Sequence, residues 1–175
     1  MPIVVTRVSD GDTVVVREDR FRAPEFRVRL YGIDAPETSQ PFGRESTQAL
    51  QQMVRLQALA LDVFAHDRYG RAIGLLYPRG GDQRQSLNVA MVREGWAYTY
   101  HRNGRYSHGL NAAQRQAKDA RRGVWGQSAS AERPWAYRRR MSERDGGLVL
   151  RPRALLWGLA LLAVLYVLAR VAGGG

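Results

Sequence analysis

The chain contains no cysteine among its 175 residues, so it forms no disulfide and offers no thiolate metal ligand. Lysine is nearly absent too, because Lys118 is the only one and the other basic residues are arginines or histidines. The sequence also shows no internal repeat. A chain of this length holds one domain with a substantial core and an additional segment, but not two ordinary domains.

Acidic residues are too few to balance the basic ones. The 27 Lys and Arg residues outnumber the 16 Asp and Glu residues, which gives a formal charge of +11. Such a charge favours polyanionic partners, namely nucleic acid or anionic lipid headgroups, although it says nothing about the fold. No obligate protein partner is implied.

Hydrophobic periodicity predicts a mixture of short strands and helices. Strands are expected at residues 3–8, 14–17, 26–31, 58–64 and 72–77. Helices are expected at residues 42–56, 87–94 and 110–120. Ser86 is the predicted N-cap of the second helix, and Gly123 is the predicted stop of the third. Val124 and Trp125 are expected to fold back onto the core.

Four carboxylates and one arginine gather where the chain is predicted to turn: Asp10, Asp12, Asp34, Glu37 and Arg29. Residues i and i+2 of an extended chain face the same way, and Gly11 permits a bend, so Asp10 and Asp12 can point into one site. Calcium and magnesium prefer such oxygen ligands. Taken alone, however, Asp-Gly-Asp-Thr is an ordinary turn, and Arg29 is a sheet-face arginine paired with a carboxylate.

Three sequence blocks, residues 10–13, 29–37 and 67–71, resemble in order and spacing the motif blocks of the staphylococcal nuclease (thermonuclease) family. Residues 95–97 and 123–126 resemble that family's closing segments, so the resemblance covers residues 3 to about 126. It implies an oligonucleotide-binding (OB) fold, mainly β with packed helices: a five-stranded Greek-key barrel plus about three helices.

The resemblance also implies roles for individual residues. Asp12 and Asp34 resemble calcium ligands, together with the backbone carbonyl of Ala35, where the family more often has threonine. Asp10 resembles a carboxylate that lies near the ion without binding it directly. Glu37 resembles the general base that activates the attacking water.

The phosphate-binding groups follow in the same way. Arg29 and Arg71 resemble the pair that grips the target phosphate, and Tyr69 resembles a hydrogen-bond donor to it. For Tyr98 and Tyr100, base stacking beside the substrate groove and ordinary packing in the core or rim remain open alternatives.

One geometric prediction does not depend on the resemblance. Arg29 and Asp34 are an odd number of residues apart, so their side chains would face opposite sides of a straight strand. A shared site therefore requires a bend near Gly32.

Beyond the resemblance, residues 127–153 are interpreted as a basic, flexible linker. Residues 154–169 form an apolar run of 16 residues, and a transmembrane helix is expected at 154–172; a buried core helix is the alternative. Arginines precede the apolar run and only Arg170 follows it, which predicts a tail anchor with the domain on the cytoplasmic side.

Together these features predict a membrane-attached, calcium-dependent nuclease that cleaves DNA or RNA with little sequence preference. The resemblance implies attack by water, departure of the 5′-oxygen and 3′-phosphate products. The alternative is a catalytically inactive OB module that tethers nucleic acid or a protein partner at the membrane. The intact acidic set argues against this alternative, because carboxylates facing phosphate do not help binding.

Overall fold

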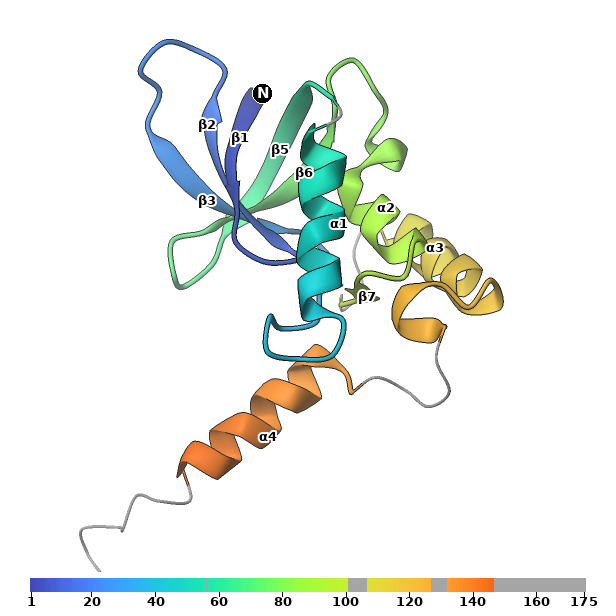
Figure 1. The fold of residues 1–175 in the computed structure, drawn as a ribbon. Coiled ribbons are helices and arrows are strands. Elements are labelled where there is room, and N and C mark those ends of the chain that lie inside the picture. The colour runs from blue at the N-terminus through green and yellow to red at the C-terminus, as the bar shows by residue number, and fades with distance from the viewer. Residues whose placement is uncertain (56, 101–106, 127–131, 147–175) are drawn as a thin grey trace, which may run out of the picture. The chain divides into compact units, whose positions relative to one another are not determined.

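Five strands close into a barrel in the computed structural model, which describes residues 1–55, 57–100, 107–126 and 132–146. Neighbours around the barrel follow the order β1, β2, β3, β6, β5 (Figure 1). The barrel strands are β1 (Pro2–Val8), β2 (Thr13–Glu18), β3 (Glu25–Leu30), β5 (Leu59–His66) and β6 (Ala72–Pro78). All neighbouring pairs are antiparallel except β3 and β6, which run parallel. The barrel is consistent with the OB fold expected from the sequence.

Alternation along the strands separates the core from the functional face. Val28 and Leu30 of β3 are almost completely buried, as are Val14 and Val16 of β2. Successive side chains of a strand point to opposite faces. Arg29, between Val28 and Leu30, therefore projects from the outer face of the barrel wall.

Three helices pack beside the barrel: α1 (Gly43–Arg55), α2 (Leu87–Arg93) and α3 (Ser107–Asp119). α1 contacts β1 and α2, and α2 contacts β6 and α3 (Figure 1). The predicted cap of α2 is confirmed, because Ser86 Oγ accepts a hydrogen bond of 3.3 Å from Val89 N. A 3₁₀ helix, Gly123–Trp125, follows α3 and buries Val124, as expected.

The chain bends between β3 and β4 (Ile33–Asp34). Gly32 has φ +74°, and a Cβ there would lie 2.6 Å from Leu110 Cδ1. The predicted bend is therefore confirmed. β4 pairs antiparallel with β7 (Tyr98–Thr99) in a two-stranded sheet that the sequence did not predict. Two-residue strands are too short to leave a periodic signal.

A fourth helix, α4 (Pro134–Gly146), lies within the stretch that was interpreted as a linker. Proline suits the first helical position, and Arg139 and Glu143 form an i,i+4 ion pair of 3.0 Å. The chain divides into two units, residues 1–137 and 138–175, and α4 begins in the first. A short 3₁₀ helix, Gln83–Gln85, precedes α2.

The predicted membrane segment, residues 154–172, lies outside the described residues. Within the ranges that the structure describes, no helix is both long and apolar enough to cross a bilayer.

Candidate active site

Arg29 lies between two buried carboxylates. It belongs to β3, whereas Asp12 directly precedes β2 and Asp34 ends β4. Arg29 Nη1 donates to Asp12 Oδ1 and Arg29 Nη2 donates to Asp34 Oδ1, both at 2.8 Å. Asp12 is 4% exposed and Asp34 0%. Because one guanidinium spans only a few ångströms, the two carboxylates converge on one small site.

The other predicted metal-site residues belong to the same hydrogen-bonded cluster. Ala35 N donates to Asp12 Oδ2 at 3.0 Å, and Asp12 N donates to Asp10 Oδ1 at 3.0 Å. Thr13 Oγ1 donates to Asp12 Oδ1 at 2.9 Å. The structure therefore brings together Asp10, Asp12, Asp34 and Ala35, from two separate stretches of chain.

The cluster has an excess of negative charge. Burial raises the pKa of Asp12 to about 7; Arg29 opposes this shift, whereas Asp10 and Asp34 add to it. When all three aspartates are ionised, one guanidinium offsets three carboxylates. A divalent cation would relieve this imbalance, and carboxylate and carbonyl oxygens are the ligands that hard cations prefer.

The donor set is nevertheless small. No group of three or more His, Cys, Asp or Glu side chains that could hold a metal occurs in the described part of the chain. A cation here would rely on Asp12 and Asp34, the Ala35 carbonyl and water. The residues fit an oxygen-ligated, partly hydrated ion such as calcium.

Gly11 lets the turn that carries Asp12 lie directly against α1. A Cβ at Gly11 would lie 1.9 Å from Ser46 Oγ and 2.7 Å from Ala35 Cβ. Ser46 is fully buried and donates to Trp96 O at 2.7 Å. The turn is thus positioned by a helix residue that sequence reasoning missed; its only signal was a small polar residue at a core position of α1.

Glu37 lies half-buried in the loop between β4 and α1. Its N–H donates to Gln40 Oε1 at 3.1 Å, and its carbonyl accepts from Gln40 N at 2.7 Å. The loop also contacts α1 closely, since a Cβ at Gly43 would lie 1.9 Å from Glu37 O. These contacts fix the backbone of Glu37, three residues beyond Asp34.

Arg71 projects from the hairpin that joins β5 and β6. Its Nε donates to Asp67 Oδ2 at 2.7 Å, while Asp67 Oδ1 accepts from Tyr69 N at 2.9 Å and Arg71 N at 3.0 Å. Burial alone would raise the pKa of Asp67, but these hydrogen bonds and the Arg71 charge lower it. Gly70 has φ +75°, a left-handed conformation that glycine adopts readily and that lets the hairpin turn tightly.

The strand register relates the positions of Arg29 and Arg71. In the parallel pairing of β3 and β6, Arg29 is opposite Ile73. Arg71 lies two residues before Ile73, in the hairpin just before β6 begins. Two residues of extended chain span about 7 Å, so Arg71 lies near the strand position opposite Arg29.

A pocket of about 280 Å³ lies beside Arg29 and is lined in part by Tyr31, Ile73 and Tyr100. Tyr100 is 54% exposed, and its N–H donates to Gly32 O at 2.8 Å. Of the two alternatives left open for this tyrosine, a place beside the candidate site is the one that its position favours.

The other two predicted tyrosines differ from Tyr100. Tyr69 is 67% exposed at the hairpin tip, with its ring 5.7 Å from Arg71 Cζ. Tyr98 is 1% exposed and packs edge-on against Trp125, at 5.1 Å between ring centroids. Core packing is therefore the alternative that describes Tyr98.

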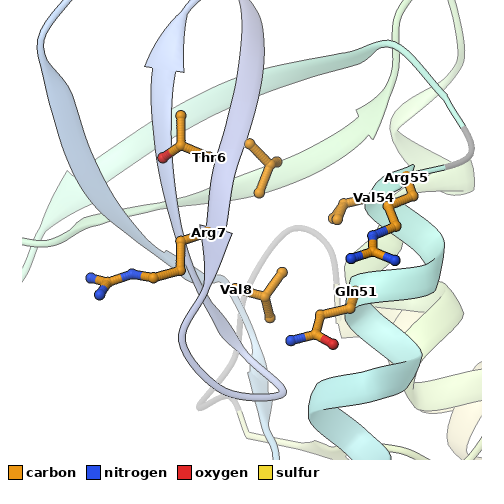
Figure 2. Close-up of a pocket in the computed structure, with 7 residues that line it drawn as sticks. Thr6, Arg7, Val8, Gln51, Val54 and Arg55 are labelled. Atoms are coloured by element: carbon orange, nitrogen blue, oxygen red, sulfur yellow. The ribbon is translucent and has the colours of Figure 1, made fainter.

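A separate pocket of about 270 Å³ lies between β1 and α1 (Figure 2). Figure 2 shows the Arg55 guanidinium turned toward Gln51, whereas Arg7 points away from both. No carboxylate and none of the predicted site residues lines this pocket. The candidate site is therefore the one around Arg29.

Comparison with known proteins gives an independent result. Residues 27–127 match a family described as staphylococcal nuclease homologue. An uncharacterized endonuclease of Escherichia coli O157:H7 is 37% identical over 136 residues, which cover 78% of this chain and 84% of that protein.

Two further relatives have more specific names. Micrococcal nuclease of Shigella flexneri is 36% identical over 141 residues, covering 77% of this chain and 79% of that protein. Staphylococcal-like nuclease CAN1 of Arabidopsis thaliana is 34% identical over 123 residues, covering 70% of this chain and 36% of that protein.

Proposed function

Because this chain belongs to the staphylococcal nuclease homologue family, we propose that it is a nuclease that hydrolyses phosphodiester bonds in DNA or RNA. The observation that carries the proposal is the bridge from Arg29 to Asp12 and Asp34, at 2.8 Å each. It places the guanidinium that we propose as the phosphate-binding group against two buried carboxylates. The names of the relatives agree with this activity.

The proposed cofactor is calcium, with Asp12, Asp34 and the Ala35 carbonyl as ligands and Asp10 supporting the Asp12 backbone. When bound, a divalent cation would offset the negative charge that develops on the phosphate during hydrolysis. The all-oxygen donor set and its excess negative charge support a hard cation. The choice of calcium rests on the family resemblance.

Arg29 and Arg71 bind the phosphate. Planar guanidinium groups pair with phosphate oxygens through two parallel hydrogen bonds, and the positive charge favours the charge-rich transition state. Tyr69 lies beside Arg71, and its hydroxyl donates a hydrogen bond to the same phosphate. Contacts to phosphate carry no sequence information, so cleavage shows little sequence preference.

Glu37 acts as the general base. Its carboxylate takes a proton from water as the water oxygen attacks phosphorus, and the bond from phosphorus to the 5′-oxygen breaks. The leaving 5′-oxygen takes up a proton from surrounding water. The products are a 3′-phosphate and a 5′-hydroxyl. The fixed backbone of Glu37 supports this role, because a general base must be held within hydrogen-bond reach of its water.

The proposal is tested by incubating the full-length chain with labelled DNA and RNA oligonucleotides, in calcium or in excess chelator. Cleavage in calcium alone, with 3′-phosphate ends, is expected. Glu37→Gln should lower the rate by about 10²- to 10⁴-fold while oligonucleotide binding persists. Glu45→Gln, which removes an exposed carboxylate in the first turn of α1, is the matched control and should cleave normally.

Two outcomes would contradict the proposal. If cleavage is equal in calcium and in chelator, calcium is not the cofactor. Oligonucleotide binding without any cleavage by the wild-type chain would favour the inactive OB module instead.

We also propose that residues 154–172 attach the protein to a membrane, with the domain on the cytoplasmic side. The support is the apolar run and the excess of arginines before it. Protease treatment of intact spheroplasts should leave the domain uncut, and lysis should expose it. Digestion of the domain before lysis would show that it lies on the other side of the membrane. Recovery of the protein in the soluble fraction would show that residues 154–172 do not anchor it.

A further inference from the structure

The segment at residues 132–137, here called the C-terminal strap, contacts the loop that carries Glu37. The strap lies within the unit that contains the barrel and ends in the first turn of α4. The match to the nuclease homologue family ends at residue 127, before the strap begins. Its contacts therefore add something that the matched region does not contain.

Gln40 links the strap directly to Glu37. Gln40 is buried, with only 5% of the residue exposed. The Oε1 atom accepts from Glu37 N at 3.1 Å, while Nε2 donates to Glu132 O. One buried amide thus bonds the backbone of the general base with one end and the backbone of the strap with the other.

A second hydrogen bond joins the same two segments. The hydroxyl groups of Ser39 and Tyr137 lie 2.9 Å apart. Ser39 and Gln40 are consecutive in the loop, whereas Glu132 and Tyr137 lie at opposite ends of the strap. The loop is therefore bonded to the strap at two points, which restrains its rotation as well as its position.

The strap also contacts β7 and the pocket wall. The Trp135 ring lies 5.6 Å from the Tyr100 ring and 6.2 Å from the Tyr98 ring, centroid to centroid. Arg133 lies over both Tyr98 and Trp135, with Cζ at 5.5 and 5.2 Å from the ring centroids. Tyr100 lines the pocket beside Arg29, so Trp135 packs against a residue that borders the candidate site.

We propose that the C-terminal strap is a positioning element for the active site: through Gln40 it fixes the Glu37 backbone, and through Trp135 it holds Tyr100 against the substrate pocket. This inference rests on the proposed nuclease function for its kinetic consequences, although the contacts exist without it. The two contacts predict separate effects. Losing the Gln40 link should impair the chemical step, whereas losing the Trp135 contact should impair substrate binding.

The kinetic test uses the full-length chain and an oligonucleotide substrate in calcium. Gln40→Met removes both amide hydrogen bonds at nearly constant volume and should lower kcat by about 10- to 100-fold, because small misplacements of a catalytic group have effects of that size. KM should stay within about twofold, since phosphate binding is unchanged. Trp135→Ala should instead raise KM by about 10-fold, and Trp135→Phe should restore most of the loss.

Hydrogen exchange gives a readout that does not depend on activity. In Gln40→Met, the amides of Glu37 and Gly43 should exchange faster than in the wild type, while the barrel amides stay protected and show that the fold is intact. Tyr137→Phe provides a milder variant, in case Gln40→Met fails to fold, and should accelerate exchange in the same loop. Tyr77→Phe is its matched control, because it removes a hydroxyl bonded to Asp62 within the β5–β6 sheet.

The outcomes separate this proposal from the nuclease function. If the wild type cleaves and the strap variants keep its kcat, KM and loop protection, the strap proposal is wrong and the nuclease function stands. If the wild type does not cleave, the nuclease function fails, and loop exchange alone decides whether the strap restrains Glu37. Equal loop exchange in Tyr137→Phe, Tyr77→Phe and the wild type would overturn the strap proposal in either case.

Discussion

Arg29 and Arg71 both pair with aspartate, but the two arrangements depend on the fold in different ways. Arg29 bonds Asp12 and Asp34, which lie 17 and 5 residues away outside β3 and are buried. Arg71 bonds Asp67 within a single hairpin, beside the exposed Tyr69. The first arrangement is a product of the whole barrel, and the second is a product of local turn geometry.

This difference indicates how stability and activity are divided between the two sites. Removing one partner of a buried ion pair leaves an uncompensated charge in the interior, which is strongly destabilising. The Arg71–Asp67 pair is partly buried, with side-chain exposures of 19% and 15%, whereas Asp12 and Asp34 are almost completely buried. Water and salt therefore screen the Arg71–Asp67 pair more, and it contributes less to stability. Arg29 should therefore serve both folding and catalysis, whereas Arg71 should serve catalysis almost alone.

The largest effect is expected from Arg29→Ala. The change leaves Asp12 and Asp34 buried without their common guanidinium, so the free energy of unfolding should fall by about 3–5 kcal/mol. Denaturant unfolding in chelator measures it. Arg27→Ala, an exposed arginine of the same strand, is the control and should change stability by less than about 0.5 kcal/mol. Equal unfolding of both variants would contradict the structural role of Arg29.

Arg71→Ala should separate activity from stability. Loss of one charge-stabilising donor should lower kcat by about 10²- to 10³-fold, while the unfolding midpoint stays close to that of the wild type. Steady-state cleavage and denaturant unfolding of the same preparation provide the two readouts. Arg68→Ala, from the same hairpin, should leave kcat unchanged. A stability loss as large as that of Arg29→Ala would remove the distinction between the two pairs.

A smaller effect is expected from Asp67→Asn. This change weakens the hold on Arg71 Nε but keeps an acceptor for the backbone amides of Tyr69 and Arg71. The rate should fall by about 10-fold, since Arg71 is less well oriented rather than absent. If the rate fell as far as in Arg71→Ala, Asp67 would act directly in the reaction and not through Arg71.

A pH dependence of the metal-free protein is also expected. Burial raises the pKa of Asp12 to about 7, above its usual 3.8, so the folded state binds this proton more tightly than the unfolded state. Stability from this group is then fully present below about pH 4 and is lost as the pH rises toward 7, by at most about 1.4 kcal/mol per pH unit. Urea unfolding in chelator from pH 4.5 to 8 should show the decline. Asp12→Asn should flatten it, and an unchanged slope would contradict the assignment.

Much of the architecture was predictable from the sequence, because long, periodic segments carry their own signal. The Val28–Leu30 alternation predicted β3, and the parity of Arg29 and Asp34 predicted the bend that Gly32 makes. Ser86 marked the start of α2 correctly. The β4–β7 pair was missed because each strand is only two residues long.

The misses at the site have a common cause. Ser46, Asp67 and Gln40 act through tertiary contacts or turn hydrogen bonds, which periodicity does not reveal. Sequence thus indicated the groups expected to touch substrate better than the groups that hold them.

The arginine-rich composition after residue 127 predicted a flexible linker, whereas the structure places α4 at Pro134–Gly146.

Calcium titration by calorimetry tests the central claim most directly, since that claim is the convergence of Asp12 and Asp34 on one cation. The wild type should bind calcium saturably, with one ion per chain at the site. Asp34→Asn should abolish this binding, while Asp62→Asn, a carboxylate on β5 outside the site, should leave it intact. Identical titrations of Asp34→Asn and the wild type, or no binding by the wild type, would contradict the account.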